Sequence, residues 1–275
     1  MGIIEKAIGR LPQQEKPEAA GPQPPRRPLP VRMGGGKTLP VADVAPVAVK
    51  ALLAIEQYPA LARDIRFLKR PVLARVFGMS RSTSRSGNLV MITSDTPQTG
   101  KSFISLNLGG SLASEQMTRV LLVDADPVRR TQSTRLGVDA RPGLLELLAG
   151  EVAGLSEVVM PTDLPSLFVL PAGKSRPDAT ELFSSPRMAE FLGLLADPDL
   201  VVLLDAPPLL LTSEGRVLAD LAHHTLVVVE AGRSTVSDIA ATVELLKSTP
   251  AGLNIVLNKS PMRNSPRYRD YYYSY

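Results

Sequence analysis

The sequence contains no cysteine, so it has no disulfide, no thiolate metal ligand and no cysteine nucleophile. This absence is consistent with a reducing compartment. No apolar run approaches the roughly 20 residues that a membrane-spanning helix needs, and the N-terminus lacks the apolar segment of a signal peptide. We therefore expect a soluble, cytoplasmic protein.

A strong excess of charge is also missing, because the formal net charge is only +4 over 275 residues. Basic residues gather in residues 63–85 and 259–269, but the first cluster contains only Phe67 and Phe77 as aromatic residues. A nucleic-acid-binding surface usually combines basic residues with aromatic or base-reading side chains. We therefore expect no nucleic acid as a partner, and an acidic membrane surface or an acidic protein suits these charges better.

Large apolar residues are scarce in residues 12–40, which hold eight prolines. Such a segment cannot bury enough surface to fold, so we predict a disordered linker over residues 12–44. Residues 1–11 have apolar residues at helical spacing and predict a short amphipathic helix that docks on a partner or on the domain, although a frayed terminus is an equal alternative. The run GGGKT at residues 34–38 is similar in sequence to a phosphate loop. We reject it as a nucleotide site, because no strand is predicted before it and Pro40 prevents a helix directly after it.

Residues 45–77 predict helices that are interrupted near Pro59 and at Pro71. Four basic residues of this segment share one face, for which a solvated charged surface is the simplest interpretation: Arg63, Arg66, Lys69 and Arg70.

From residue 88 onward, apolar strand-like runs alternate with helical ones. The six predicted strands are residues 89–93, 120–124, 167–170, 201–205, 225–229 and 253–257. This alternation predicts an α/β domain over residues 45–260, with a mostly parallel sheet covered by helices on both faces. In such sheets ligands bind beyond the carboxyl ends of the strands. The pair His223 and His224 lies between a helix and a strand, far from these ends, and is interpreted as surface.

The first predicted strand leads into the loop DTPQTGKS at residues 95–102, and a helical pattern follows from Phe103. This strand–loop–helix order predicts a phosphate-binding loop, although Asp95 stands where the usual pattern has its first glycine. Backbone N–H groups would cradle phosphate oxygens, Lys101 would contact the β- and γ-phosphates, and the Ser102 hydroxyl would bind Mg²⁺. The alternative is an ordinary turn with these residues.

Carboxylates end two other predicted strands. Asp124 and Asp126 follow the second strand, and Asp205 ends the fourth. Mg²⁺ on a nucleotide is held by one or two carboxylates together with phosphate oxygens and water. We therefore predict that ATP and Mg²⁺ bind at the loop, with Ser102 and Asp205 holding the metal and with Asp124 and Asp126 near the γ-phosphate. A lone aspartate after a strand is more often a cap or turn residue, but this combination with Lys101 favours the site.

Tyrosines are concentrated at the end of the chain. Five of the six tyrosines lie in the last eight residues: Tyr268, Tyr271, Tyr272, Tyr273 and Tyr275. Chain ends are usually mobile, so we predict a flexible tail over residues 261–275. Many phenols on a flexible segment, attached to an ATP site, are what a protein that phosphorylates itself on tyrosine requires. The alternative is a tail with no chemistry.

Together these motifs resemble the bacterial tyrosine kinases of exopolysaccharide and capsule synthesis, nearest the cytoplasmic autokinases encoded with exosortase-type loci. The family's phosphate loop is similar to residues 97–102, its Asp-x-Asp motif to residues 120–126 and its Asp-x-Pro-Pro motif to residues 203–208. Further similar segments are residues 1–11, 141–144, 170–173 and 257–259. The resemblance implies a P-loop NTPase of MinD/ParA-like architecture.

By resemblance the chain is an ATP-dependent protein-tyrosine autokinase that regulates exopolysaccharide polymerisation and export. The implied nucleotide contacts are Thr96, Pro97, Gln98, Thr99, Gly100, Lys101, Ser102, Phe103 and Asn258. The implied catalytic residues are Lys101, Asp124, Asp126 and Asp205, and the implied metal ligands are Ser102, Asp205 and Asp124. Asp124 would accept the tyrosine proton. We expect transfer between subunits, because the tail leaves the last strand near Asn258 and would have to fold back to its own site.

The resemblance also implies partners. A membrane polysaccharide co-polymerase, or chain-length regulator, would activate the kinase and hold it at the inner membrane, and a phosphotyrosine phosphatase would reverse the reaction. Self-association is expected. However, Arg63 stands where the family's ring-forming helix often has an acidic residue, so the sequence leaves undecided whether the subunits form a ring. Two alternatives remain: a non-catalytic nucleotide-binding assembly protein, and a ParA/MinD-like ATPase, although Thr96 stands where those ATPases have a signature lysine.

Overall fold

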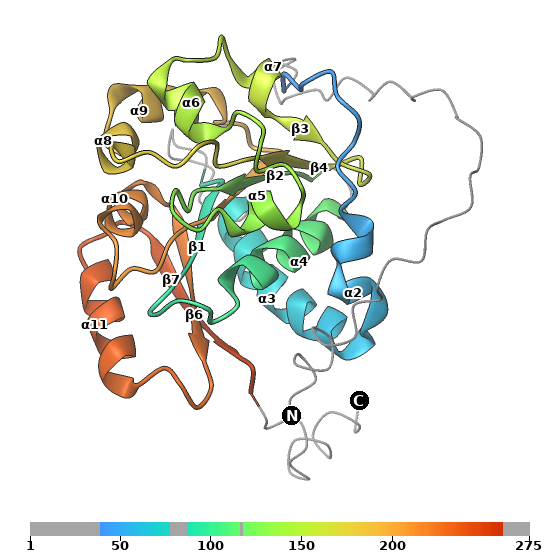
Figure 1. Cartoon of the computed structure of the whole chain (residues 1–275). Coiled ribbons are helices and arrows are strands. Elements are labelled where there is room, and N and C mark those ends of the chain that lie inside the picture. The colour runs from blue at the N-terminus through green and yellow to red at the C-terminus, as the bar shows by residue number, and fades with distance from the viewer. Residues whose placement is uncertain (1–38, 78–86, 116–117, 261–275) are drawn as a thin grey trace.

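The computed structural model describes residues 39–77, 87–115 and 118–260 of the chain (Figure 1). The predicted N-terminal helix, the phosphate-loop imitation at residues 34–38 and most of the predicted linker fall outside the described residues. The tyrosine-rich tail over residues 261–275 also falls outside them.

A seven-stranded sheet forms the centre of the domain, in the order β3-β4-β2-β5-β1-β6-β7. The strands are β1 Leu89–Ser94, β2 Arg119–Asp124, β3 Met160–Pro161, β4 Leu167–Leu170, β5 Leu200–Asp205, β6 His224–Glu230 and β7 Gly252–Asn258. Neighbouring strands pair in parallel except β3, which is antiparallel to β4. The predicted α/β fold with a mostly parallel sheet is confirmed. The edge strand β3 was not predicted, because two residues that include a proline show no periodicity.

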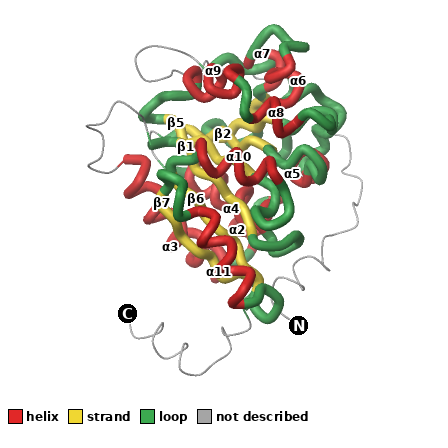
Figure 2. Tube along the Cα trace, turned by 90° about the vertical axis from the view of Figure 1, so that its left-hand side faces the viewer, coloured by secondary structure: helices red, strands yellow, loops and turns green. Residues whose placement is uncertain are grey.

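Helices cover both faces of the sheet. They are η1 Lys50–Leu52, α2 Ala54–Gln57, α3 Pro59–Phe77, α4 Lys101–Ala113, α5 Thr131–Arg135, α6 Leu144–Ala149, α7 Leu155–Val158, α8 Ala179–Phe183, α9 Pro186–Leu194, α10 Ser213–Leu221 and α11 Val236–Leu246. Successive strand residues point to opposite faces, so Met91 of β1 packs in the core beneath α10 whereas Ile92 packs in the core beneath α3 and α4. Figure 2 views the sheet from the side that α10 and α11 cover.

The break predicted near Pro59 is confirmed, because α2 ends at Gln57 and α3 begins at Pro59. The break predicted at Pro71 is wrong, because α3 continues through this residue to Phe77. A proline inside a helix removes one hydrogen bond and can cost about 3 kcal/mol. The buried side chains of α3, including Val72, bind the helix to the sheet on both sides of the proline and outweigh that loss.

The segment before η1 belongs to the domain rather than to the linker. Leu39 is 1% exposed and Ala42 is 6% exposed. Val47 donates its N–H to the Pro161 carbonyl at 2.9 Å and forms a parallel bridge with Thr162 beside β3. The domain therefore begins before residue 45, because these apolar side chains cover the edge of the sheet and contribute to its core.

His224 is not a surface residue, contrary to the prediction from the sequence. It is fully buried at the start of β6, where it pairs with Gly252 of β7. A Cβ atom at residue 252 would approach the His224 Nδ1 to 3.0 Å, so the glycine leaves room for the imidazole. His223 accepts a hydrogen bond at Nδ1 from the Leu89 N–H. Both residues lie at the amino edge of the sheet, opposite the candidate site.

Candidate active site

The phosphate loop joins the end of β1 to the N-terminus of α4. Its backbone takes left-handed conformations at Gln98, with φ 65°, and at Gly100, with φ 97°. Within the described residues, no acceptor is recorded for the N–H groups of residues 98–103. These groups and the positive end of the α4 dipole form the kind of cradle that binds phosphate oxygens.

The last residue of β7 and the residue after it support this loop from the side. The Asn258 side-chain amide donates to the Thr99 carbonyl at 2.7 Å, and Lys259 Nζ donates to the Gln98 carbonyl at 2.9 Å. A Cβ atom at Gly100 would lie 2.3 Å from Asn258 Nδ2. The glycine is therefore required both by the positive φ and by this close approach. Asn258, which only the family resemblance assigned to the nucleotide site, lies directly against the loop.

The loop lysine lies among the carboxylates that end the neighbouring strands. Lys101 Nζ is 3.2 Å from Asp126 Oδ2 and 3.9 Å from Asp205 Oδ1. Asp124 and Asp205 are paired neighbours in the register of β2 and β5. The sheet order β2-β5-β1 thus brings together the three strand ends that the sequence singled out.

These charged groups are almost completely buried, which changes their acidity. Burial and the charge of Asp205 raise the pKa of Asp124 to about 7. Burial also raises the pKa of Asp205, although the Lys101 ammonium opposes this effect. Burial alone would lower the pKa of Lys101, but Asp205 and Asp126 together raise it above its ordinary value. The site therefore has a surplus of negative charge that a divalent cation would offset.

The residues beside the helix start match the requirements of a magnesium-bound nucleotide. Asp205 Oδ2 is buried with no hydrogen-bond partner among the described residues, while Oδ1 accepts a bond from the Ser105 hydroxyl at 3.3 Å. Ser102 lies against this carboxylate. No group of three or more His, Cys, Asp or Glu in the described part of the chain could hold a metal ion.

Several residues that hold the site in place were not predicted. Ser133 donates to Asp124 Oδ2 through its N–H at 2.7 Å and through its hydroxyl at 2.8 Å, and its hydroxyl accepts the Ala172 N–H at 2.9 Å. Gln132 Nε2 donates to the Ser102 carbonyl at 2.6 Å. Both α5 residues are fully buried. A weak sequence signal existed, because Ala172 belongs to a family-like segment, but nothing in the sequence indicated that α5 contacts it.

Two further family-like segments, residues 141–144 and 170–173, contact each other beside the site. Leu144 donates its N–H to the Pro171 carbonyl at 2.8 Å, which joins residues 141–144 to residues 170–173. The Glu146 carboxylate accepts the Gly143 N–H and the Lys174 N–H, both at 2.8 Å. Through Ala172 and Ser133 these contacts continue to Asp124.

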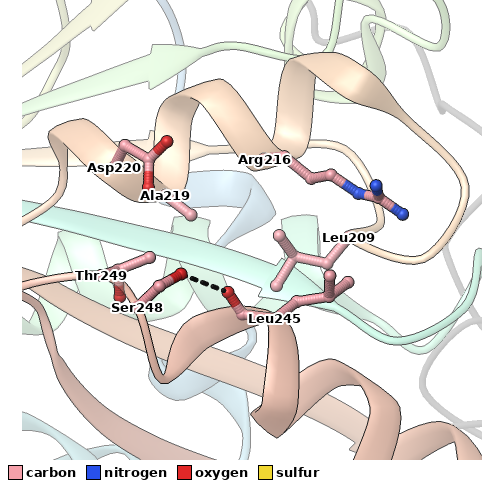
Figure 3. Close-up of a pocket in the computed structure, with 7 residues that line it drawn as sticks. All are labelled: Leu209, Arg216, Ala219, Asp220, Leu245, Ser248 and Thr249. Atoms are coloured by element: carbon pink, nitrogen blue, oxygen red, sulfur yellow. Dashed lines mark hydrogen bonds between the residues drawn. The ribbon is translucent and has the colours of Figure 1, made fainter.

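A cavity of about 190 Å³ lies away from this site, between α10 and α11 (Figure 3). Arg216 and Asp220 come from α10, and Ser248 and Thr249 follow α11. The Ser248 hydroxyl points to the Leu245 carbonyl of α11, with a separation of 3.5 Å. The cavity contains none of the predicted site residues.

Comparison with known proteins identifies the relatives of the chain. No protein-family model matches it. It is 35% identical over 181 residues to EpsB of Ralstonia nicotianae, a match that covers 66% of this chain and 24% of EpsB. It is 31% identical over 186 residues to the tyrosine-protein kinase ptk of Acinetobacter johnsonii, covering 68% of this chain and 25% of ptk. The chain is a relative of the bacterial tyrosine-protein kinases. The resemblance inferred from the motifs is thus confirmed.

Solved structures of this kinase family share the fold. The kinase domain of the Escherichia coli tyrosine kinase ETK has a TM-score of 0.62 and 28% identity, covering 70% of this chain and 73% of that one. The BceF tyrosine kinase domain has a TM-score of 0.63 and 28% identity, covering 74% and 81%. A MinC:MinD cell division protein complex of Aquifex aeolicus matches with a TM-score of 0.51 and 25% identity, covering 61% and 67%. The fold is therefore that of a bacterial tyrosine kinase domain with MinD-like architecture.

The match to these relatives is partial. The chain spans about a quarter of the length of the first curated relatives, 24% of EpsB and 25% of ptk. Within the described residues, no helix is long and apolar enough to cross a membrane.

Proposed function

We propose that this chain is an ATP-dependent protein-tyrosine autokinase that phosphorylates the tyrosines of its own C-terminal tail. One observation carries the proposal: Lys101 lies within 4 Å of carboxylates from two strand ends, at a phosphate loop in which the N–H groups of residues 98–103 have no protein acceptor among the described residues. Kinship with the bacterial tyrosine kinases supports the choice of tyrosine as the acceptor, and the five tail tyrosines provide it.

Binding of ATP rests on the loop and its supports. The N–H groups of residues 98–103 would bind the phosphates, with Thr96, Pro97 and Phe103 flanking them and with Asn258 holding the loop. Lys101, which is paired with Asp126 in this structure, would turn to the β- and γ-phosphates when ATP binds, because these phosphates are also anionic. Ser102 and Asp205 would hold Mg²⁺, which neutralises charge on the phosphates.

Phosphoryl transfer depends mainly on position and charge. The tyrosine oxygen forms a bond to the γ-phosphorus while the bond from that phosphorus to the ADP oxygen breaks. Asp124 accepts the phenol proton in this proposal. Its pKa of about 7 suits proton exchange near neutral pH. Ser133 donates two short hydrogen bonds to Asp124 Oδ2, whereas Oδ1 accepts one longer bond, from the Asp126 N–H at 3.3 Å, so we assign the proton to Oδ1.

In this proposal the transfer takes place between subunits, and the point at which the tail begins supports this choice. Asn258 ends β7 and contacts the phosphate loop of its own subunit, so the tail leaves the domain beside its own site. Its tyrosines begin ten residues later, at Tyr268, and would have to double back to reach that site. A neighbouring subunit offers the same site without this reversal.

The unmodified tail is basic, with Arg263, Arg267 and Arg269 against Asp270. It can therefore approach a site with a surplus of carboxylates. Each phosphate adds roughly −1.5 to −2 charges at neutral pH, so several of them make the tail strongly anionic. An anionic tail would leave the carboxylate-rich site and loosen an assembly held by it, and such cycling would regulate exopolysaccharide polymerisation and export.

The wider context of this activity is also part of the proposal. A membrane polysaccharide co-polymerase would activate the kinase and hold it peripherally at the inner membrane, and a phosphotyrosine phosphatase would reset the tail. The purified chain could show full kinase activity that no membrane protein encoded at its locus changes. This result would contradict the proposed activation by a partner, but not the proposed kinase activity.

The assignment of the site is tested by replacing the loop lysine. Lys101→Met is expected to reduce tyrosine phosphorylation by at least about 100-fold, because it removes the cation that neutralises the transferred phosphate. The matched control is Lys247→Met, which removes a cation paired with Glu244 on the surface of the domain. Phosphotyrosine formed from Mg²⁺ and ATP would be measured for both. Wild-type labelling by Lys101→Met would contradict the assignment.

A further inference from the structure

A groove of about 380 Å³ lies along α3, on the sheet face opposite α10 and α11. Arg63, Arg66, Phe67 and Arg70 line it at positions that share one face of the helix. The three arginines belong to the basic face that we interpreted from the sequence as a solvated charged surface, whereas its fourth residue, Lys69, is buried. The groove is also lined by the apolar residues Phe67 and Leu73 and by the ion pair of Lys69 with Glu115. It can therefore select a ligand by more than its charge.

Two arginines of the groove are available to a ligand. Arg66 and Arg70 are exposed and form no ion pair with any described residue. Lys69, in contrast, is already engaged: its side chain is nearly buried, pairs with Glu115 and donates to the Ser111 carbonyl. The groove therefore offers two guanidinium groups one helical turn apart, which suit a phosphate with several acceptor oxygens.

Apolar walls stand beside these arginines. Phe67 is 53% exposed, unusual for a phenylalanine, and Leu73 lines the groove farther along α3. A flat ring placed against Phe67 would bury apolar surface while its substituent reaches the guanidinium groups. An aromatic ring that carries a phosphate, as in phosphotyrosine, matches both features. Inorganic phosphate would use only the charges.

The groove is remote from the phosphate loop. Lys69 contacts Ser111 in the last turn of α4, whereas Lys101 opens the first turn of the same helix. Ten residues of helix separate these positions, which corresponds to about 15 Å. Figure 1 shows α3 lying along α4. A ligand in the groove would leave the phosphate loop open.

We propose that this groove binds the phosphorylated C-terminal tyrosines of a second copy of the chain. The proposal rests on the proposed autokinase function, because that function supplies the phosphotyrosines. Charge selects this occupant: the unmodified tail carries three arginines against one aspartate and is repelled by the groove. Several phosphates reverse the sign of the tail, so the same segment becomes attracted. The groove would then hold a phosphorylated tail after it leaves the site, away from further transfer.

The test uses a synthetic peptide of residues 266–275 with phosphate on Tyr271, Tyr272 and Tyr273, added to the unphosphorylated full chain without ATP. Fluorescence anisotropy should show binding that weakens as salt increases, and at least tenfold weaker binding of the unphosphorylated peptide. Comparable binding of both peptides would overturn the proposal.

Variants locate the binding. The double variant Arg66→Ala with Arg70→Ala should weaken phosphopeptide binding roughly tenfold or more. Arg66→Lys with Arg70→Lys should give a smaller loss, because the charges remain but the planar forks are lost. Phe67→Ala should weaken binding of the peptide but not of inorganic phosphate. The matched control is Arg216→Ala, an exposed arginine of α10 on the opposite face (Figure 3), which should bind like the wild type.

Two further outcomes would overturn the proposal. One is wild-type phosphopeptide affinity in the double alanine variant, with thermal unfolding unchanged. The other is binding of phosphatidylserine vesicles through Arg66 and Arg70 without any phosphopeptide binding, which would assign the groove to a membrane. Because the peptide is phosphorylated synthetically, these results do not depend on kinase activity. A failed Lys101→Met test would therefore leave the groove result interpretable.

Discussion

At the scale of single residues, the site is built from charges that the protein alone does not balance. Lys101 stands against the buried carboxylates Asp126 and Asp205, with Asp124 beside them. Burial is the main cause of the raised pKa values of Asp124 and Asp205, and neighbouring carboxylate charges add to it. A cation bound beside these carboxylates would favour their ionised forms.

The imbalance predicts how stability depends on pH. The pKa of Asp124 is about 7 in the folded protein, against an ordinary value of 3.8. Between these values the folded state binds more protons than the unfolded state, so the free energy of unfolding falls as pH rises from about 4 to about 7. We expect a loss of a few kcal/mol over this window in the absence of nucleotide. Urea unfolding at pH 5, 6, 7 and 8 would measure it.

Asp205→Asn provides the control for this prediction. The substitution removes the charge that adds to burial in raising the pKa of Asp124. The decline in stability towards neutral pH should therefore become shallower, and stabilisation by Mg²⁺ with ATP should be lost. A wild-type free energy of unfolding that rises between pH 5 and pH 7 would contradict the account.

At the scale of elements, α3 shows packing overriding a local signal. Pro71 lies inside the helix, yet the buried residues Ile65, Val72 and Val76 hold both halves of α3 on the sheet. The helix is therefore retained with one backbone hydrogen bond fewer than its length allows.

Replacing this proline should stabilise the protein. Pro71→Ala restores an N–H to the middle of α3 and is expected to raise the free energy of unfolding by about 1–2 kcal/mol, after allowance for the more flexible unfolded chain. The matched control is Pro186→Ala at the first turn of α9, where proline is well tolerated and no gain is expected. Urea unfolding would compare the two variants. Equal or lower stability of Pro71→Ala would mean that α3 is not a regular helix at this point.

The elements also show what a sequence can reveal. Apolar runs located the six longer strands, and the aspartates at their ends predicted a candidate site, because strand ends and motifs are local features. The short strand β3, the helix through Pro71 and the burial of His224 depend on contacts with distant segments. Ser133 was missed because its role depends on a tertiary contact: its hydroxyl donates to Asp124, which lies nine residues earlier in the chain.

At the scale of the whole molecule, the length of α4 separates two charged surfaces. The carboxyl edge carries the phosphate loop and its aspartates, and the far end of α4 adjoins the basic groove of α3. A tail that starts basic and becomes anionic would be attracted first to one and then to the other. The sequence predicted the first of these surfaces from motifs, but the groove requires the packing of α3 on α4 to be seen.

The central claim is transfer of phosphate from ATP to tail tyrosines of another subunit. The most direct measurement mixes a Lys101→Met chain that keeps its tail with an active chain truncated after Asn264, and locates phosphotyrosine by mass spectrometry. The Lys101→Met chain alone is the control. We predict phosphate on Tyr271, Tyr272, Tyr273 or Tyr275 of the inactive chain, at a rate that increases with concentration. No phosphate on the inactive chain, while the full-length enzyme labels itself at a rate independent of concentration, would contradict the account.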